Sequence, residues 1–385
     1  MGLSVILLSV VIMNFSVNLY AQKKGESPVQ WKIGGQLPSF NSKRAVGFAG
    51  PVTGMSGNRL IIAGGANFPD SMPWTGGKKK YHDSIYVYEY MNDSFVLENQ
   101  SSTLPISNAY AANCTTSKGI VYAGGENENG ISNKVTILRW DTQRNEAVFS
   151  DLPQLPVALT NAGSVAIDGI VYIGGGETTN AASGRFFCLD LKKEGAAWKE
   201  LPSIPKPVSH AVWIANPDLH DKSVFLIGGR AKNTNGISNL YQSVYRFDIG
   251  LQQWEEKAPL PYALSAGTGI AVDTGQLLIF GGDKGETFHQ TEKLLVAIRN
   301  ENDDSKKAEL INKKNELQSN HPGFSRQILL YDLRKDVWEA VGCMPYETPV
   351  TTSAISWNSK VIIPSGEVRA GVRSPHVLVG TIKFK

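Results

Sequence analysis

The stretches LIIAGG (60–65), IVYAGG (120–125), IVYIGG (170–175), VFLIGG (224–229) and LLIFGG (277–282) decide the fold of this 385-residue chain. Each is a short apolar run that ends in a glycine doublet, and a degenerate sixth copy, VIIPSG, occupies 361–366. The copies recur at intervals of roughly fifty to sixty residues, with one longer interval before the last. A regular period of this size is typical of a propeller or solenoid built from one repeated unit.

The remainder of each unit indicates which architecture is repeated. After each of the first five doublets, a polar loop is followed by a second strand-like run, at 83–90, 134–141, 185–191, 243–249 and 327–333. A tryptophan and then a proline corner follow in several units, at Trp198, Trp254 and Trp338. These are the features of a kelch blade, a four-stranded unit of a β-propeller. We therefore predict an all-β chain that folds as a six-bladed kelch β-propeller.

The sixth unit is incomplete at the end of the chain. After Gly366 one strand-like run remains, within 376–384, and no tryptophan-bearing strand follows it. A counterpart of the missing strand lies near the start, where VQWKIGGQLP (29–38) carries Trp31. We predict that this segment pairs with 376–384 and completes the last blade, because closure of the ring removes exposed sheet edges. The propeller then occupies 22–385 as one domain.

One segment interrupts the repeat between Gly282 and the strand at 327–333. Its apolar residues recur at helical spacing among charged ones, at Leu294, Leu295, Ile298, Leu310 and Ile311. We predict a helical insertion in blade five, on the same face of the ring as the other loops that follow the doublets. A long loop with its own structure more often forms a lid or wall of a site than a spacer.

Residues 1–21 differ in composition from everything that follows. MGLSVILLSVVIMNFSVNLYA is apolar, ends in the small residue Ala21 and gives way abruptly to Gln22-Lys23-Lys24. This pattern predicts a secretory signal peptide, and we expect a periplasmic protein of a Gram-negative bacterium. The stretch has no Lys or Arg at its start, so a retained anchor is the alternative. After removal of the signal we expect no contact with a membrane.

Composition argues against several classes of partner. The formal net charge is only +3, and no basic stripe of the kind that binds nucleic acid is present. The three cysteines include no CxxC pair, so they predict neither a disulfide framework nor a zinc site. The six histidines show no metal-ligand spacing. We therefore expect neither a metal ion nor a cofactor, and the oligomeric state is left open.

Two sets of residues are predicted to surround the central channel of the propeller. Equivalent positions of the blades encircle the channel, so the residues after the doublets form one set: Ala66, Glu126, Glu177, Arg230, Asp283 and Glu367. Residues at the starts of the inner strands form the second set, at the same mouth: Arg44, Asn108, Asn161, His210 and Ser265. Several ionisable side chains that converge on a funnel are typical of a site for a polar ligand. For any single residue, an ordinary solvated loop position is the alternative.

Two segments resemble a known family. GEVRAGVRS (366–374) is similar to the Gly-Glu-x-x-x-Gly-x-Arg segment of kelch-type N-acetylneuraminate mutarotases, also called N-acetylneuraminate epimerases. AGGANFPDSMPWTGGKKKYHDSIYVY (63–88) resembles the circularly permuted branch of that family, in which the Glu–Arg segment lies near the C-terminus. The resemblance covers essentially all of 28–385. It implies interconversion of the α and β anomers of N-acetylneuraminate, a sialic acid, outside the cytoplasm.

The resemblance also implies roles for particular residues. Glu367 becomes the catalytic acid/base, and Arg373 holds the carboxylate of the sugar acid, for which a planar guanidinium is well suited. Without the resemblance, a salt bridge within the loop is the alternative for this pair. Further substrate contacts are expected from Arg44, Arg230, Glu177, His210 and Asn161. The alternative function is a propeller that binds a sialic acid or glycan, or a protein-interaction scaffold, without catalysis.

Cleavage of the N-terminal segment is the first testable expectation. The mature chain should begin near Gln22, because the apolar stretch ends at Ala21. Mass spectrometry of the exported protein should therefore give the mass of the chain without residues 1–21. Recovery of a chain that still begins at Met1 would instead identify the segment as an anchor.

Overall fold

The computed structural model describes residues 27–39, 45–99, 102–218, 221–272 and 275–383. The described residues form six four-stranded sheets, which confirms the six-bladed β-propeller. The expected signal peptide at 1–21 and the candidate site residue Arg44 lie outside the described residues.

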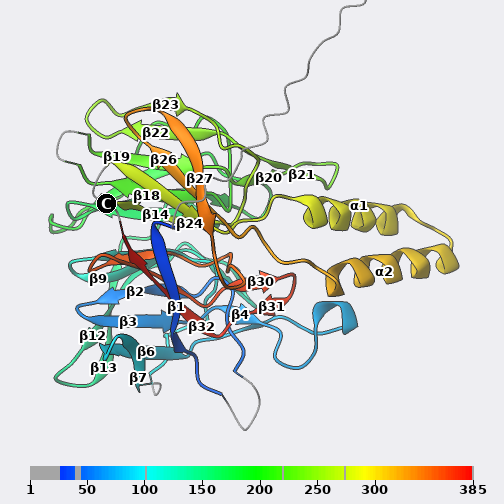
Figure 1. Cartoon of the computed structure of the whole chain (residues 1–385), viewed down its shortest axis with the longest axis horizontal. Coiled ribbons are helices and arrows are strands. Elements are labelled where there is room, and N and C mark those ends of the chain that lie inside the picture. The colour runs from blue at the N-terminus through cyan, green and yellow to red at the C-terminus, as the bar shows by residue number, and fades with distance from the viewer. Residues whose placement is uncertain (1–26, 40–44, 100–101, 219–220, 273–274, 384–385) are drawn as a thin grey trace, which may run out of the picture.

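Five blades consist of strands that follow one another along the chain (Figure 1). Blade one contains β2 (Val52–Ser56), β3 (Arg59–Ala63), β6 (Ile85–Met91) and β7 (Ser94–Asn99). Blade two contains β8 (Ala112–Thr116), β9 (Gly119–Ala123), β12 (Val135–Asp141) and β13 (Glu146–Leu152). Blade three contains β14 (Thr160–Ile167), β15 (Ile170–Glu177), β16 (Phe186–Asp190) and β17 (Lys199–Glu200). Blade four contains β18 (Val212–Asn216), β19 (Ser223–Ile227), β22 (Val244–Asp248) and β23 (Gln253–Lys257). Blade five contains β24 (Thr268–Val272), β25 (Gln276–Phe280), β26 (Gln327–Asp332) and β27 (Val337–Cys343).

The sixth blade joins the two ends of the chain. It contains β28 (Ile355–Trp357), β29 (Lys360–Pro364) and β32 (His376–Ile382), and its outer strand is β1 (Val29–Gln36). The strands β1 and β32 pair antiparallel, with Trp31 opposite Gly380. The Trp31 ring also packs edge-on against Phe280 of blade five, with 5.2 Å between ring centroids. The predicted closure of the propeller by its N-terminal strand is therefore confirmed.

The hydrophobic core is divided among the six interfaces between neighbouring blades. In blade one, Ile61 and Ala63 belong to a cluster shared with blade two. The alternate residues Leu60 and Ile62 belong to a cluster shared with blade six. Since successive side chains of a strand point to opposite faces, a blade buried on both faces needs a continuous apolar run rather than an alternating one. This explains the apolar stretches that precede the doublets.

The glycine doublets connect each blade to the next. Gly64 and Gly65 both have positive φ, of 63° and 89°, and a Cβ on Gly64 would lie 2.4 Å from the carbonyl oxygen of Asn108. The Gly65 N–H donates to that same carbonyl at 2.7 Å. The doublet is therefore required for close approach of the next blade's backbone. In blade six Ser365 takes the first position, with φ of 58°, and its hydroxyl accepts from the N–H of Phe48 at 2.8 Å.

Short hairpins and two helices extend from one mouth of the propeller. The hairpins are β4–β5 (Ala66–Asn67, Lys80–Tyr81), β10–β11 (Glu126–Asn127, Gly130–Ile131), β20–β21 (Arg230–Lys232, Ser238–Leu240) and β30–β31 (Glu367–Arg369, Val372–Arg373). The predicted insertion in blade five is confirmed as α1 (Glu286–Asn300) and α2 (Asp304–Ser319), which lie side by side and project from the blades (Figure 1). A short 3-10 helix, η1 (Pro73–Thr75), contacts α2. Within the described part of the chain, neither helix has the length and apolar composition that a membrane span requires.

Closure by β1 predicts unequal effects of two substitutions on that strand. Val29 is 2% exposed and packs between blades five and six, whereas Ile33 is 42% exposed. Val29→Ala should lower the free energy of unfolding by about 2 kcal/mol through lost burial and a cavity. Ile33→Ala, the matched control, should cost less than about 0.5 kcal/mol. Urea titrations of both variants test this, and equal effects would contradict a structural role for the pairing of β1 with β32.

Candidate functional site

A closed circle of backbone hydrogen bonds surrounds the propeller axis. One residue per blade, just before or at the start of the inner strand, donates its N–H to the carbonyl of the corresponding residue in the preceding blade at 2.7–3.2 Å. All six residues have positive φ, between 52° and 61°. We call them the ring residues: Gly50, Tyr110, Asn161, His210, Ala266 and Thr351. Five of them are not glycine, and such backbone is found mainly where the surrounding structure enforces it, often at functional sites.

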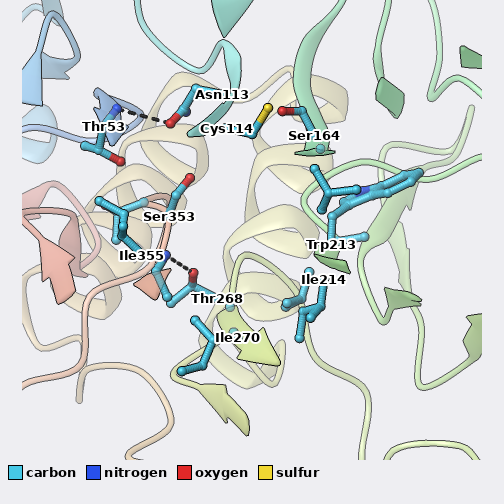
Figure 2. Close-up of a pocket in the computed structure, with 18 of the residues that line it drawn as sticks. Thr53, Asn113, Cys114, Ser164, Trp213, Ile214, Thr268, Ile270, Ser353 and Ile355 are labelled. Carbon is cyan, nitrogen blue, oxygen red and sulfur yellow. Dashed lines mark hydrogen bonds between the residues drawn. The ribbon is translucent and has the colours of Figure 1, made fainter. Parts of the chain in front are cut away.

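The ring residues lie between two hollows. On one side is the central channel, about 430 Å³ in volume, lined by the inner strands of all six blades. Figure 2 shows its lining, in which hydroxyl and thiol groups alternate with apolar side chains: Thr53, Cys114, Ser164, Trp213, Ile214 and Ile270. On the other side, among the hairpins and the helical insertion, is a cavity of about 410 Å³ with a lining rich in charged groups. We call this second hollow the upper cavity, and it is the candidate site.

All but one of the residues that follow the doublets line the upper cavity; Ala66 is not among the lining residues. Each pairs with the residue just before a ring residue, as Ser209 pairs with Arg230 and Val350 with Glu367 through isolated β-bridges; in blade three, Glu177 pairs with Thr160 within the β14–β15 ladder. Five of the six predicted residues line the cavity: Glu126, Glu177, Arg230, Asp283 and Glu367. In blade three the two positive-φ glycines are Gly175 and Gly176, so Glu177 is the direct equivalent of the others.

The second predicted set agrees with the ring residues at two positions. Asn161 and His210 are ring residues and line the upper cavity. Ser265 lies one residue before the ring residue of blade five and also lines the cavity. Asn108 lies two residues before Tyr110, is not among the lining residues, and donates its side-chain amide to the carbonyl of Gly124 at 2.9 Å. The sequence did not indicate Tyr110 as a site residue.

Glu367 and Arg373 face each other across the hairpin β30–β31. They are register partners, and Arg373 Nη1 lies 3.7 Å from Glu367 Oε1. The same Oε1 accepts the N–H of Gly371 at 2.7 Å. Arg373 is buried, stacks at 4.8 Å over the ring of Phe68 and is not among the residues that line the cavity. Both contacts of Glu367 use Oε1, so Oε2 is the carboxylate oxygen left for a ligand.

A chain of hydrogen bonds connects Arg230 with Glu177. Arg230 Nη2 lies 3.1 Å from His210 Nε2, and a guanidinium can only donate, so this histidine nitrogen accepts. His210 Nδ1 then carries the proton and donates to Ser209 Oγ at 3.1 Å, and Ser209 donates to Glu177 Oε1 at 2.6 Å. Burial, and then the Arg230 charge, hold the pKa of His210 well below its ordinary value. His210 is therefore neutral, and both of its ring nitrogens are used within the protein.

Glu126 has its own partners, in and next to β5. Its Oε1 accepts from Tyr81 Oη at 2.7 Å and from Lys79 Nζ at 2.9 Å. Burial raises the pKa of Glu126, but these two hydrogen bonds and the lysine charge outweigh it, so the pKa lies below the ordinary value. The Lys79 ammonium also lies over the ring of Tyr110, 5.3 Å from its centroid. Glu126 is thus held ionised and is engaged by the protein itself.

The helical insertion supplies a wall of the upper cavity that the sequence predicted only in outline. Its lining residues are Thr287, Phe288, Thr291, Gln318, His321 and Phe324. Glu292 of α1 accepts two hydrogen bonds from Ser238, from its N–H at 2.8 Å and its hydroxyl at 2.6 Å, which fixes the insertion to the hairpin β20–β21. His321 accepts the N–H of Gly323 through Nδ1 at 3.0 Å, so in the neutral ring Nε2 carries the hydrogen.

The described residues contain no cluster of His, Cys, Asp and Glu that could hold a metal ion. The side chains that converge on the cavity include carboxylates, an arginine, a lysine, histidines, amides and hydroxyls, with the aromatic rings of Phe288 and Phe324 beside them. Such groups suit a polar organic ligand that is rich in hydroxyl groups and carries its own charge.

His210 is predicted to make the stability of the fold pH-dependent. Because its pKa is lowered in the folded protein, the unfolded chain takes up a proton at a higher pH than the folded one. Stability is therefore complete above the ordinary histidine pKa and is lost as pH falls below it, by at most about 1.4 kcal/mol per pH unit.

Urea unfolding of the wild type and of His210→Asn at several pH values between about 7.5 and 5 tests this point. Asparagine already occupies the equivalent ring position with the same φ of 53°, at Asn161, so the backbone should tolerate it. The free energy of unfolding should fall more steeply in the wild type, since the other histidines contribute equally to both proteins. Parallel pH profiles would contradict a neutral, buried His210.

Comparison with known proteins places this chain in a family. A family model described as N-acetylneuraminate epimerase matches residues 16–146 and 152–385. Curated relatives named N-acetylneuraminate epimerase include one from Salmonella typhi, 24% identical over 58% of this chain and 56% of its own length. Another, from Pasteurella multocida (strain Pm70), is 25% identical over 60% of this chain and 58% of its own length. The chain thus spans somewhat more than half of the length of these relatives.

A solved structure shares the fold. The structure titled "Structure of YjhT" aligns with a TM-score of 0.61 over 86% of this chain and 94% of that chain, at 14% sequence identity. The likeness at this identity concerns the fold alone. The family model, in contrast, covers the doublets, the hairpins and the Glu–Arg segment together. The chain therefore belongs to the N-acetylneuraminate epimerase family.

Proposed function

We propose that this protein is a mutarotase that interconverts the α and β anomers of N-acetylneuraminate, with Glu367 as the catalytic acid/base. Membership of the family supports the reaction class. The observation that carries the assignment is the position of Glu367 in the wall of the upper cavity, with one carboxylate oxygen held by the hairpin and the other left for a ligand.

The proposed reaction opens and recloses a cyclic hemiketal. A base takes the proton of the anomeric hydroxyl, the bond between the anomeric carbon and the ring oxygen breaks, and the ring oxygen gains a proton. Rotation of the open keto acid and closure on the other face give the second anomer. A positioned carboxylate is suited to proton transfer of this kind, which contributes typically 10²–10⁴-fold. Arg373 then acts in this proposal as the group that orients Glu367, through Oε1.

The ring oxygen of the sugar needs a second group, one that donates a hydrogen bond to it as the ring opens. We look for this group in the helical insertion. His210 is a poor candidate, because both of its nitrogens are occupied by Arg230 and Ser209. His321 lines the same cavity, and the contact with Gly323 leaves its Nε2–H as the available donor. A neutral imidazole in this role stabilises the oxygen on which negative charge develops. The setting proposed for the reaction is the periplasm, on the sequence of residues 1–21 alone.

Glu367→Gln is the variant that tests the catalytic assignment. Glutamine keeps the shape of the side chain but cannot take up or release the proton, so the rate of anomer exchange should fall by roughly 10²-fold or more. The rate is followed by NMR on freshly released α-N-acetylneuraminate, while calorimetry measures binding, which should change less.

Glu347→Gln serves as the control for removal of a carboxylate. Glu347 pairs with Arg369 on the same hairpin, but its side chain is 52% exposed and it is not among the residues that line the cavity. This variant should exchange anomers at the wild-type rate. Full activity in Glu367→Gln would overturn the catalytic assignment. Binding of the sugar without faster exchange in the wild type would favour the alternative, a sialic-acid-binding propeller.

A further inference from the structure

Arg230 is the arginine of the upper cavity that remains open to a ligand. It lines the cavity, and none of the ion pairs formed by the described residues within 4.0 Å involves it. Four carboxylates attract it from longer range, and each has a nearer partner: Ser209 for Glu177, the N–H of Gly285 for Asp283, Ser238 for Glu292 and Arg373 for Glu367. A partly buried cation without a direct counter-ion is costly unless a ligand supplies one.

Arg373 is less accessible than Arg230. Its Nε and Nη1 are buried and have no hydrogen-bond partner in the described structure. These two nitrogens are out of reach of a carboxylate oxygen unless the hairpin moves, which leaves Nη2 as the Arg373 nitrogen that is not closed off in this way. The Arg230 nitrogens do not share this state, because none of them is both buried and without a partner. The two arginines therefore differ in access, although both carry the same charge.

Two neighbours orient the Arg230 guanidinium. Its face stacks on the ring of Phe288, 4.6 Å from the centroid, and Nη2 donates to the neutral His210. Stacking on an aromatic face leaves the edge of the guanidinium for hydrogen bonds in its own plane, which is the geometry that carboxylates prefer. Because His210 is neutral, it fixes the orientation of Arg230 without cancelling the charge.

The helical insertion holds this arrangement in place. Phe288 belongs to α1, and Arg230 begins the hairpin β20–β21. The two elements are joined at Ser238, whose N–H and hydroxyl donate to Glu292 and whose carbonyl accepts from His289 Nε2 at 2.9 Å. Hydrogen bonds between blade four and the insertion in blade five therefore hold Phe288 against Arg230.

We infer that Arg230, stacked on Phe288 and oriented by His210, is the subsite that binds the carboxylate of the sugar acid. The inference rests on the proposed function for the identity of the sugar, and it moves the carboxylate contact from Arg373 to Arg230. Arg373 then serves Glu367, and the two arginines have separate tasks. Neutral sugars lack the group that this subsite recognises.

The test compares N-acetylneuraminate with its methyl ester, which lacks the negative charge. Calorimetry on the purified full chain should show that the wild type binds the acid at least about tenfold more tightly than the ester, the worth of a charge-assisted hydrogen bond. Arg230→Gln should bind both compounds about equally, and Arg230→Lys should keep part of the preference. If Arg230→Gln does not fold, as judged by circular dichroism, Phe288→Ala replaces it and should reduce the preference.

Two further variants make the result specific. Arg369→Gln removes the same charge from an exposed side chain, 48% accessible, and should keep the wild-type preference. Arg373→Lys should also keep the preference. Loss of the preference in Arg373→Lys, its survival in Arg230→Gln, or no preference in the wild type would each overturn the inference. Anomer exchange is measured separately, so a wild type without exchange but with an Arg230-dependent preference would refute the mutarotase proposal alone.

Discussion

The closed circle of six backbone hydrogen bonds at the ring residues is the constraint on which the rest of the structure depends. Each bond joins neighbouring blades close to the axis, and each requires a left-handed backbone conformation. For a residue other than glycine such a conformation costs about 1–3 kcal/mol and persists only where the surroundings determine it. The six apolar clusters between neighbouring blades hold the blades in place. They thereby impose this conformation on the loops at the axis.

The same constraint organises the upper cavity. The residue before each ring residue bridges to the residue after a doublet, so two circles of side chains are held at fixed heights above the channel. Side chains on such a frame can differ from blade to blade without a change in backbone. Blade two presents Glu126 with a fixed counter-ion, blade four presents an open Arg230, and blade six presents Glu367. Preorganised charges of this kind need little rearrangement when a ligand binds.

The fold was predictable because each element has a local signature. The doublets and the apolar runs before them predict the blades, and the Trp31 segment predicts how the propeller closes. The helical spacing of apolar residues predicts the insertion. The circle of ring residues was not predicted from the sequence; of the residues expected at the starts of the inner strands, Asn161, His210 and Ser265 line the upper cavity, whereas Asn108 does not. The loops before the inner strands have no hydrophobic period, so their register depends on hydrogen bonds to the next blade. The faces of α1 and α2 that meet the cavity depend likewise on tertiary contacts such as that of Glu292 with Ser238.

The proposed roles of Arg230 and Arg373 differ because the two side chains differ in their access to the upper cavity. Their positions in the sequence do not show this difference. The motif that contains Glu367 and Arg373 is visible in the sequence, and the charge of Arg373 suggested contact with an anionic sugar. In the folded chain that guanidinium is buried within the hairpin β30–β31, and Arg373 Nη1 lies 3.7 Å from Glu367 Oε1, too long for a strong hydrogen bond. In the proposed mechanism, a contact of this length orients the carboxylate without a strong hydrogen bond to it. Arg230 lines the upper cavity and Arg373 does not, which is why the carboxylate subsite is proposed at Arg230.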